Sequence, residues 1–264
     1  MAKSDNALIV TENLTTGYGS AEVTKGVSIS ASSGEVIALI GPNGSGKSTL
    51  LKTIAGAIKP LSGSVAIAGQ NVTELSKKEA AKLLAYVPQF ESPAFDYTAQ
   101  QIVLMGRQSR AEGLFETQED LQVAEKSLAT VDASAFADRK ITELSGGEQQ
   151  RVLIARALAQ EAPALLMDEP IAHLDVRHRL DLGSLLQELK ILGKAVMVAV
   201  HDIDWAVQFT DRVVVLHEGE VLIDLPSLEA AKSPAIDRAF EVGFKRYESE
   251  DSVRLLPDQS EDLP

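Results

Sequence analysis

Cysteine is absent from this sequence, and so is any apolar run long enough to cross a membrane. Without a thiol, the chain can form neither a disulfide bond nor a thiolate metal site. A membrane-spanning helix needs about 20 consecutive apolar residues, and no stretch of the sequence approaches that length. Residues 1–6 also lack the long apolar core of a secretory signal. We therefore expect a soluble, cytoplasmic chain that serves a membrane, if at all, through a partner.

Positive charge is also scarce. The 264 residues include 25 lysines and arginines against 38 aspartates and glutamates, which gives a formal net charge of −13. A nucleic-acid-binding protein needs a basic face to neutralise phosphates, so this balance argues against nucleic acid as a partner. The segment from Tyr247 onward contains part of this excess of negative charge, because it has six acidic residues and a single basic residue, Arg254. The length allows one domain with an inserted lobe.

A glycine-rich loop follows the continuous apolar run 36–40. The loop residues are Gly41, Pro42, Asn43, Gly44, Ser45, Gly46, Lys47, Ser48 and Thr49. The glycines let backbone amides close around phosphates, Lys47 can reach the β- and γ-phosphate oxygens, and the Ser48 hydroxyl can ligate Mg²⁺. The alternative is a glycine-rich turn with an exposed lysine. The strand predicted before the loop and the helix predicted after it favour the phosphate site.

Apolar patterning predicts an α/β fold around this P-loop. Runs 164–167 and 195–200, like 36–40, are typical of parallel strands buried on both faces. Further strands are predicted at 8–16, 23–31 and 65–68, with a hairpin of 213–216 and 221–223, and a helix is predicted at 77–84. Between Phe90 and Ala162, apolar residues recur at helical spacing with little strand signal.

We therefore predict one domain over residues 1–264 in three parts. Residues 1–89 and 162–235 form an α/β core around the P-loop. Residues 90–161 form an inserted α-helical subdomain. Residues 236–264 form a C-terminal extension that is polar, proline-containing and frayed beyond Leu255.

A second phosphate-binding device lies at Leu144–Arg151. Ser145, Gly146 and Gly147 stand at the start of a predicted helix, where bare backbone N–H groups attract phosphate oxygens. Two such devices in one small chain suggest that a nucleotide is held from two sides.

Two of the predicted buried strands end in polar residues. Asp168 and Glu169 follow the run 164–167, at the edge of an α/β sheet where ligands bind. Asp168 can hold Mg²⁺ through water, and Glu169 can take a proton from an attacking water. A solvated strand end is the alternative, but the P-loop favours the functional interpretation. His201 ends the run 195–200, and although a lone histidine there is more often structural, this one can point at a γ-phosphate.

The remaining candidates are less specific. Gln89 lies where the core meets the helical subdomain, and its amide could sense Mg²⁺ or water, although a single glutamine proves nothing. Tyr18 stands between two glycines and could stack on a base or simply form a turn. His173, His178 and His217 lack comparable settings and are expected to be surface or packing residues.

Together, these motifs resemble the ATP-binding subunit of an ABC transporter, in order, over residues 8–225. The matching segments are Tyr18 (A-loop), Gly41–Thr49 (Walker A), Gln89 (Q-loop), Leu144–Arg151 (signature), Leu165–Glu169 (Walker B), Ile171–Asp175 (D-loop) and His201 (switch histidine). Ile171 departs from the small hydroxyl residue that is usual at its position.

The resemblance implies a RecA-like P-loop core with an N-terminal antiparallel β region. It also implies a head-to-tail homodimer that sandwiches two ATP molecules. Each ATP would lie between the Walker A of one subunit and the signature of the other, so that Ser145–Gly147 contact ATP held by the partner. Glu169 would be the general base, Lys47 and His201 would contact phosphates, and Asp168, Gln89 and Ser48 would surround Mg²⁺. Two transmembrane permease subunits would place the chain at the cytoplasmic face of the membrane, with a substrate-binding protein as an indirect partner.

Segments 75–89, 95–98, 103–107 and 172–175 are similar to those of importers of iron–siderophore, haem and cobalamin. Met105-Gly106-Arg107 occurs in zinc and manganese importers too, which leaves a zinc or manganese importer ATPase as an alternative. A soluble, non-transport ABC ATPase is another alternative. Neither the sustained heptads of repair members nor the second cassette of translation members is present.

Overall fold

The computed structural model describes residues 6–89, 96–110, 116–249 and 252–258. The strands in these ranges are β1 (Ala7–Tyr18), β2 (Ala21–Val27), β3 (Ser30–Ser32), β4 (Glu35–Ile40), β5 (Ser62–Ile67), β6 (Gln70–Asn71), β7 (Leu84–Val87), β8 (Ala164–Asp168), β9 (Ala195–Ala199), β10 (Arg212–His217), β11 (Glu220–Pro226), β12 (Phe244–Glu248) and β13 (Val253–Pro257). The α-helices are α1 (Lys47–Ile54), α2 (Lys77–Leu83), α3 (Ala99–Leu104), α4 (Gln118–Thr130), α5 (Gly146–Ala159), α6 (Val176–Ile191), α7 (Ile203–Phe209), α8 (Ser227–Lys232) and α9 (Pro234–Phe240). Short 3₁₀ helices are η1 (Met105–Ser109), η2 (Ser134–Phe136) and η3 (Ile141–Glu143).

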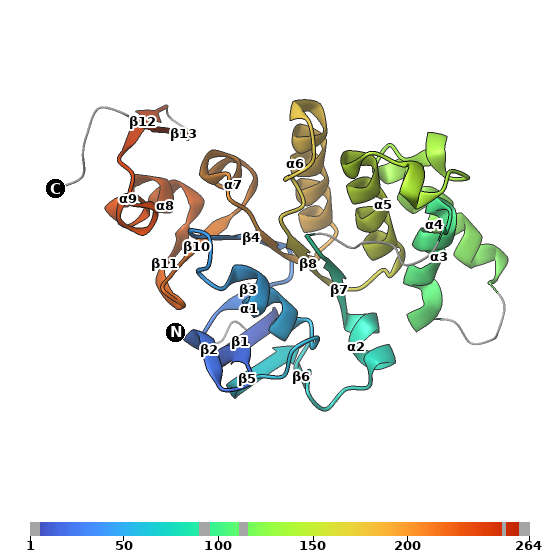
Figure 1. Ribbon diagram of the computed structural model, residues 1–264, viewed down its shortest axis with the longest axis horizontal. Helices are drawn as coiled ribbons and strands as arrows, with labels where there is room; N and C mark the ends of the chain where they lie inside the picture. Colours follow the sequence, from blue (N-terminus) through green and yellow to red (C-terminus); the bar gives the residue numbers. More distant parts are fainter. Residues whose placement is uncertain (1–5, 90–95, 111–115, 250–251, 259–264) are drawn as a thin grey trace.

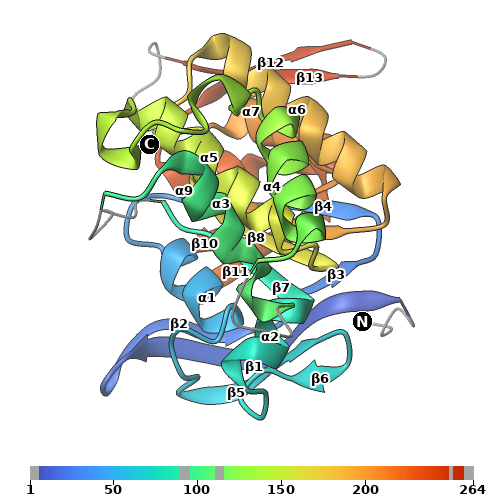
Figure 2. The same ribbon diagram turned by 90° about the vertical axis from the view of Figure 1, so that its right-hand side faces the viewer.

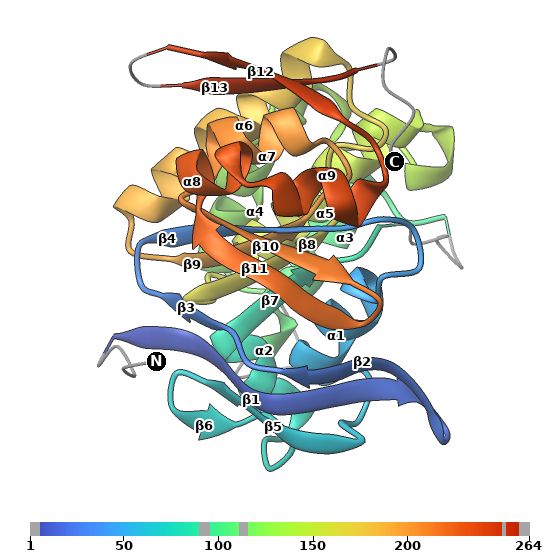
Figure 3. The same cartoon turned by 90° about the vertical axis from the view of Figure 1, so that its left-hand side faces the viewer.

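The elements are stacked in layers (Figure 1). The antiparallel sheet, with β2, β1, β5 and β6 in that order and β3 paired to β1, lies on one side, and α1 lies between it and the second sheet. Helices α6, α7, α8 and α9 cover the opposite face of that second sheet, and the β12–β13 hairpin lies outside them (Figure 2 and Figure 3). Helices α3, α4 and α5 gather to one side as a lobe.

The second sheet has the order β11-β10-β4-β9-β8-β7, and β10, β4, β9, β8 and β7 are parallel. Alternate residues of its strands enter different cores: Val36, Ala38 and Ile40 pack on the α6 side, whereas Ile37 and Leu39 pack on the α1 side. Burial on both faces explains the continuous apolar runs, and it confirms the strands predicted from them.

The strand predicted over 23–31 is wrong, because two strands, β2 and β3, occupy that stretch. Both pair with β1, and the Thr11 side chain fills the break between them. The Thr11 hydroxyl accepts a hydrogen bond from the Ile29 N–H (2.9 Å) and donates to the Val27 carbonyl (3.1 Å). A side-chain hydroxyl therefore satisfies backbone groups that would otherwise continue the ladder.

The helical lobe has its own apolar core of residues from α3, α4, α5 and the 3₁₀ segments. Helix α5 serves two cores, because Val152 and Ala155 pack inside the lobe while Leu153, Ile154 and Ala157 pack against the parallel sheet. The lobe predicted from helical periodicity is present in this part of the chain. Its predicted first residues, from Phe90, lie outside the described residues.

The C-terminal extension is more ordered than expected. The predicted fraying beyond Leu255 is wrong as far as Pro257, because β13 pairs with β12 up to the Phe244–Pro257 pair. Val253 and Leu255 are buried, and Arg254 forms an ion pair with Asp204 of α7 (2.6 Å). The Asp204 contact comes from about 50 positions away, which local composition does not reveal. Residues 259–264 lie outside the described residues.

Among the described residues, no helix combines the length and apolarity needed to cross a membrane.

Candidate functional site

The glycine-rich loop lies between β4 and α1, as predicted, and its backbone requires glycine at two tight positions. At Gly46 (φ 101°), an added Cβ would lie 2.4 Å from Thr24 Cγ2. At Gly41 (φ 153°), it would lie 2.2 Å from the Leu216 carbonyl oxygen. A side chain at either position would force the loop away from β2 or β10.

Lys47 is folded back onto this loop. Its ammonium donates to the carbonyl oxygens of Gly41 (2.8 Å) and Pro42 (3.1 Å). Burial lowers the pKa of Lys47, and the carboxylates of Glu169 and Asp168 oppose that effect. Ser45 Oγ is also buried and has no hydrogen-bond partner among the described residues. A cation and an orphaned hydroxyl in one loop fit the binding of an anionic ligand.

The loop borders a cavity of about 300 Å³, called the Lys47 cavity below. The cavity is lined by Val23, Asn43, Gly44, Gly46, Lys47, Ser48, Thr49, Gln89, Glu169 and His201. The fold therefore brings together residues that lie up to about 180 positions apart in the sequence. Tyr18 is not part of this lining; it ends β1 and its side chain is exposed.

Asp168 ends β8 and is not among the residues that line the cavity, and only 1% of its surface is exposed. Its Oδ1 accepts a hydrogen bond from Ser48 Oγ (3.0 Å), and its Oδ2 accepts one from the Tyr86 hydroxyl (3.3 Å). Burial raises the pKa of Asp168, and the neighbouring Glu169 charge adds to this, while the two hydrogen bonds oppose it. Burial and the Asp168 charge also raise the pKa of Tyr86, so its hydroxyl stays protonated and acts as a donor.

These donors fit a magnesium ion. Mg²⁺ prefers oxygen ligands and usually takes one or two carboxylates together with substrate phosphates and water. The Ser48 hydroxyl and the Asp168 carboxylate are such ligands and already touch each other, and Gln89 brings an amide oxygen to the same cavity. Within the described residues, no group of three acidic, histidine or cysteine side chains could hold a metal. A metal here would therefore depend on a phosphate ligand.

Glu169 and His201 meet at the cavity from adjacent strands. Glu169 directly follows β8, and His201 comes two residues after the end of β9. The Glu169 carboxylate is paired with His201 Nε2. Glu169 adopts a left-handed backbone (φ 51°), which is uncommon for a residue with a side chain, and its N–H donates to the Ala199 carbonyl (2.9 Å). Such a constrained carboxylate is typical of functional sites.

The Ser145–Gly147 segment lies beside a different cavity, of about 330 Å³. Ser145 caps α5, and its N–H donates to Glu148 Oε2 (2.7 Å). The cavity lining is Ser145, Gly146, Gly147, Glu148, Arg151, His173, Leu174, Asp175 and His178. It shares no residue with the lining of the Lys47 cavity. The two predicted phosphate-binding devices therefore do not face one common cavity in this chain.

Two histidines that were expected to be surface or packing residues belong to this second cavity. An added Cβ at Gly147 would lie 2.9 Å from the His173 carbonyl oxygen, which shows how closely the two segments approach. His178 Nδ1 lies 2.9 Å from Asp175 Oδ1. His173 lies within the segment 171–175 that resembles the D-loop, whereas His178 lies just beyond that segment. His217 ends β10 and is half-buried.

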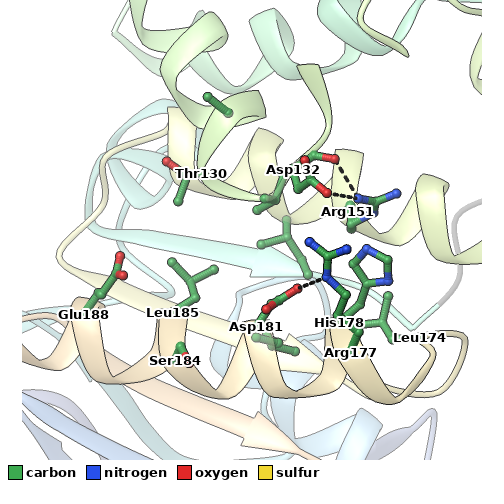
Figure 4. Close-up of a pocket in the computed structure, with 14 residues that line it drawn as sticks. Thr130, Asp132, Arg151, Leu174, Arg177, His178, Asp181, Ser184, Leu185 and Glu188 are labelled. Atoms are coloured by element: carbon green, nitrogen blue, oxygen red, sulfur yellow. Dashed lines mark hydrogen bonds and ion pairs between the residues drawn. The ribbon is translucent and has the colours of Figure 1, made fainter. Parts of the chain in front are cut away.

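A third cavity, of about 310 Å³, separates the lobe from α6 (Figure 4). Arg151 on the lobe side donates to the Asp132 carbonyl (2.6 Å), and Arg177 on α6 lies 3.9 Å from Asp181. Both ion-pairing partners lie on the same side of the cleft as their arginine (Figure 4). These two arginines therefore do not bridge the lobe to α6.

A family model described as ABC transporter matches residues 24–172, which include the glycine-rich loop, Gln89, Leu144–Arg151 and Asp168–Glu169. A hemin import ATP-binding protein of Gloeobacter violaceus is 42% identical over 204 residues, which is 75% of this chain and 74% of that protein. A cobalamin import ATP-binding protein of Halobacterium salinarum is 40% identical over 233 residues, 86% of this chain. This chain spans 58% of the length of that relative.

Solved structures show the same fold. One, described as an inward-facing metal-chelate type ABC transporter, has a TM-score of 0.82 at 27% identity and covers 97% of this chain and 99% of its own. Another is a dimeric ATP-binding cassette in a post-hydrolysis state with ADP and phosphate. Its TM-score is 0.75 at 32% identity, and the match covers 83% of this chain and 98% of that one.

Proposed function

Because this chain belongs to the ABC transporter family, we propose that it is the ATP-hydrolysing subunit of a metal-chelate importer. One observation supports hydrolysis above all others. Glu169 and His201 pair beside Lys47 and the glycine-rich loop, in one cavity. A carboxylate next to a phosphate-binding loop is where a base must lie if water is to attack a γ-phosphate.

In the proposed reaction, backbone amides of Gly41–Thr49 hold the phosphates of ATP. Lys47 exchanges its contacts with the Gly41 and Pro42 carbonyls for the β- and γ-phosphate oxygens. Ser48, Asp168 and Gln89 would hold Mg²⁺, which when bound would neutralise charge on the phosphate oxygens. Glu169 takes a proton from the attacking water while the water oxygen bonds to the γ-phosphorus. The bond from the γ-phosphorus to the β–γ bridging oxygen breaks, and ADP leaves with that oxygen. His201 orients Glu169 and contacts the γ-phosphate.

We propose a head-to-tail homodimer in which Ser145, Gly146 and Gly147 contact the ATP of the partner subunit. The separate linings of the two cavities support this arrangement, because Ser145, Gly146 and Gly147 do not line the Lys47 cavity of their own chain. The dimeric cassette with ADP and phosphate is a solved example of pairing in a similar chain. Two permease subunits would then hold the dimer at the cytoplasmic face of the membrane, and a substrate-binding protein would act through them.

The names of similar proteins support a metal chelate as the imported substrate. The relatives are described as hemin and cobalamin import proteins, and the solved transporter is described as of metal-chelate type. An iron–siderophore belongs to the same chemical class. These names favour this reading over a zinc or manganese importer and over a soluble ATPase. The permease and the binding protein would choose among the chelates.

Transport by the reconstituted complex tests this proposal. The chain would be co-purified with the permease encoded beside its gene, placed in vesicles and supplied with Mg²⁺ and ATP on the side that this chain occupies. Uptake of hemin, cobalamin and a ferric siderophore would be compared, with free Zn²⁺ and Mn²⁺ as alternative cargoes. We expect ATP-dependent uptake of one chelate. Uptake of a free metal ion instead, or failure of the chain to associate with any permease, would contradict the proposal.

A further inference from the structure

Tyr86 forms a hydrogen bond with Asp168, and the proposed reaction gives this tyrosine no role. Its hydroxyl lies 3.3 Å from Asp168 Oδ2, while Ser48 Oγ lies 3.0 Å from Oδ1. The buried carboxylate is therefore held at both oxygens by two hydroxyl donors from different elements, one from β7 and one from α1.

Sheet register explains how Tyr86 reaches this carboxylate. Tyr86 pairs with Leu166 of the neighbouring parallel strand, and both pack into the core on the α1 side. Asp168 lies two residues beyond Leu166, so it points to the same face of the sheet. A diagonal neighbour at this offset is within reach of a long aromatic side chain. A smaller side chain at position 86 would not span the gap.

The two hydroxyls have different tasks. Ser48 is an expected ligand of Mg²⁺, so its oxygen serves the metal as well as Asp168. The Tyr86 hydroxyl contacts Oδ2, the oxygen that Ser48 does not contact, and Tyr86 does not line the Lys47 cavity. A donor fixed to the second oxygen of a ligating carboxylate limits its rotation, and such supporting contacts tune metal sites strongly.

Strand β7 is anchored well enough to act as a support. It is the last strand in the sheet order, bonded along one side to β8. Gln160, at the end of α5, donates from Nε2 to the carbonyl oxygen of Leu84 (2.7 Å), the first residue of β7. The last residue of β7 precedes Pro88 and Gln89, and Gln89 lines the Lys47 cavity. The same short strand therefore holds Tyr86, which contacts Asp168, and leads into Gln89, another expected magnesium ligand.

We propose that Tyr86 is a positioning residue of the magnesium site: its hydroxyl holds Asp168 Oδ2 so that Oδ1 stays turned toward Ser48. The proposal rests on the proposed function, because it requires that the site binds a magnesium nucleotide. Tyr86 contacts neither nucleotide nor water in this role. Its removal should weaken metal binding while leaving the metal-independent grip of the glycine-rich loop intact.

The test compares the full chain with Tyr86→Phe, which removes the hydroxyl and keeps the ring. Tyr247→Phe is the matched control, because Tyr247 is exposed on the distant β12 strand. Mn²⁺ binding to the ADP-saturated protein would be measured by electron paramagnetic resonance, and ADP affinity would be measured separately in EDTA. Thermal unfolding would verify folding, and Tyr86→Met would serve as a second hydroxyl-free variant if Tyr86→Phe did not fold.

We expect Tyr86→Phe to bind Mn²⁺ on the order of tenfold more weakly, the lower end of the loss seen when such supporting residues are removed. ADP affinity in EDTA should stay unchanged, and the Mg²⁺ concentration for half-maximal ATPase activity should rise while kcat recovers at high Mg²⁺. Unchanged Mn²⁺ affinity would overturn the proposal, and so would an equal loss of ADP affinity in EDTA. Failure of the wild-type chain to bind ADP or hydrolyse ATP would instead refute the proposed function.

Discussion

Replacing Ser145 by arginine separates the two roles that this residue combines. Ser145 caps α5 through its hydroxyl and, in the proposed dimer, faces the partner's ATP. Loss of an N-cap typically costs about 1 kcal/mol. For a chain of this size, that loss lowers the melting temperature by about 2–4 °C. The monomer should therefore fold and unfold nearly as the wild type does.

The dimer should respond far more strongly. Ser145 is exposed, so an arginine side chain at this position would project from the Ser145–Gly147 segment into the space that a partner would occupy. The Lys47 cavity does not include Ser145, so ATP binding to the monomer should remain within about twofold of the wild type. We expect Ser145→Arg to abolish the ATP-bound dimer altogether.

The assay is size-exclusion chromatography with light scattering, at saturating ATP, in a Glu169→Gln background that prevents turnover. Ser145→Ala is the matched comparison, because it loses the same cap without adding bulk. It should show the same small fall in melting temperature and should still form some dimer. An ATP-bound dimer of Ser145→Arg, or loss of monomer ATP binding in parallel with the dimer, would refute the reasoning.

Two further predictions concern the helical lobe. Asp120 accepts a hydrogen bond from the buried Arg107 (2.9 Å), which, with the Thr117 contacts, lowers the pKa of Asp120 from 3.8 to about 2. Because this pKa is lower in the folded state, the stabilisation from Asp120 is present above pH 4 and is lost as the pH falls toward 2. The thermal stability of Asp120→Asn should therefore lack that part of the acid dependence. A pH profile of stability identical to that of the wild type would contradict this prediction. Gly106→Ala would place a Cβ 2.3 Å from the Arg156 carbonyl oxygen. We therefore expect the free energy of unfolding, measured in urea, to fall by about 1–3 kcal/mol. Wild-type stability of this variant would show that the contact is not tight.

Much of the candidate site was predictable from sequence because it follows from strand ends. Asp168, Glu169 and His201 each come at or just after the end of a buried apolar run, and parallel strands bring such ends to one edge. The P-loop needed only its own spacing and flanking elements. Local sequence was therefore sufficient wherever one parallel strand leads directly into the site.

The missed features depend on contacts between distant segments. Tyr86 reaches Asp168 through the register of β7 against β8, which no local pattern of a four-residue strand fixes. His173 and His178 reach the Ser145 cavity only because the chain turns after Glu169 and passes beside Gly147.

The same cause explains the errors in the fold. Thr11 divides β2 from β3 through hydrogen bonds across 16 and 18 positions. Strand β13 is held by Asp204, about 50 positions before it. In both cases a polar side chain from another element contributes to the order of the segment, and apolar periodicity does not reveal that contact.

The most direct measurement of the central claim is ATP turnover by Glu169→Gln. The substitution removes the proposed base and keeps a side chain of the same shape, while Lys47, Ser48 and Asp168 are untouched. We expect kcat to fall by about 10²–10⁴-fold with ATP binding and ATP-dependent dimerisation preserved. Glu229→Gln, on the exposed side of α8, is the matched control and should turn over like the wild type. Near-normal turnover of Glu169→Gln would contradict the assignment of this site as the ATPase centre.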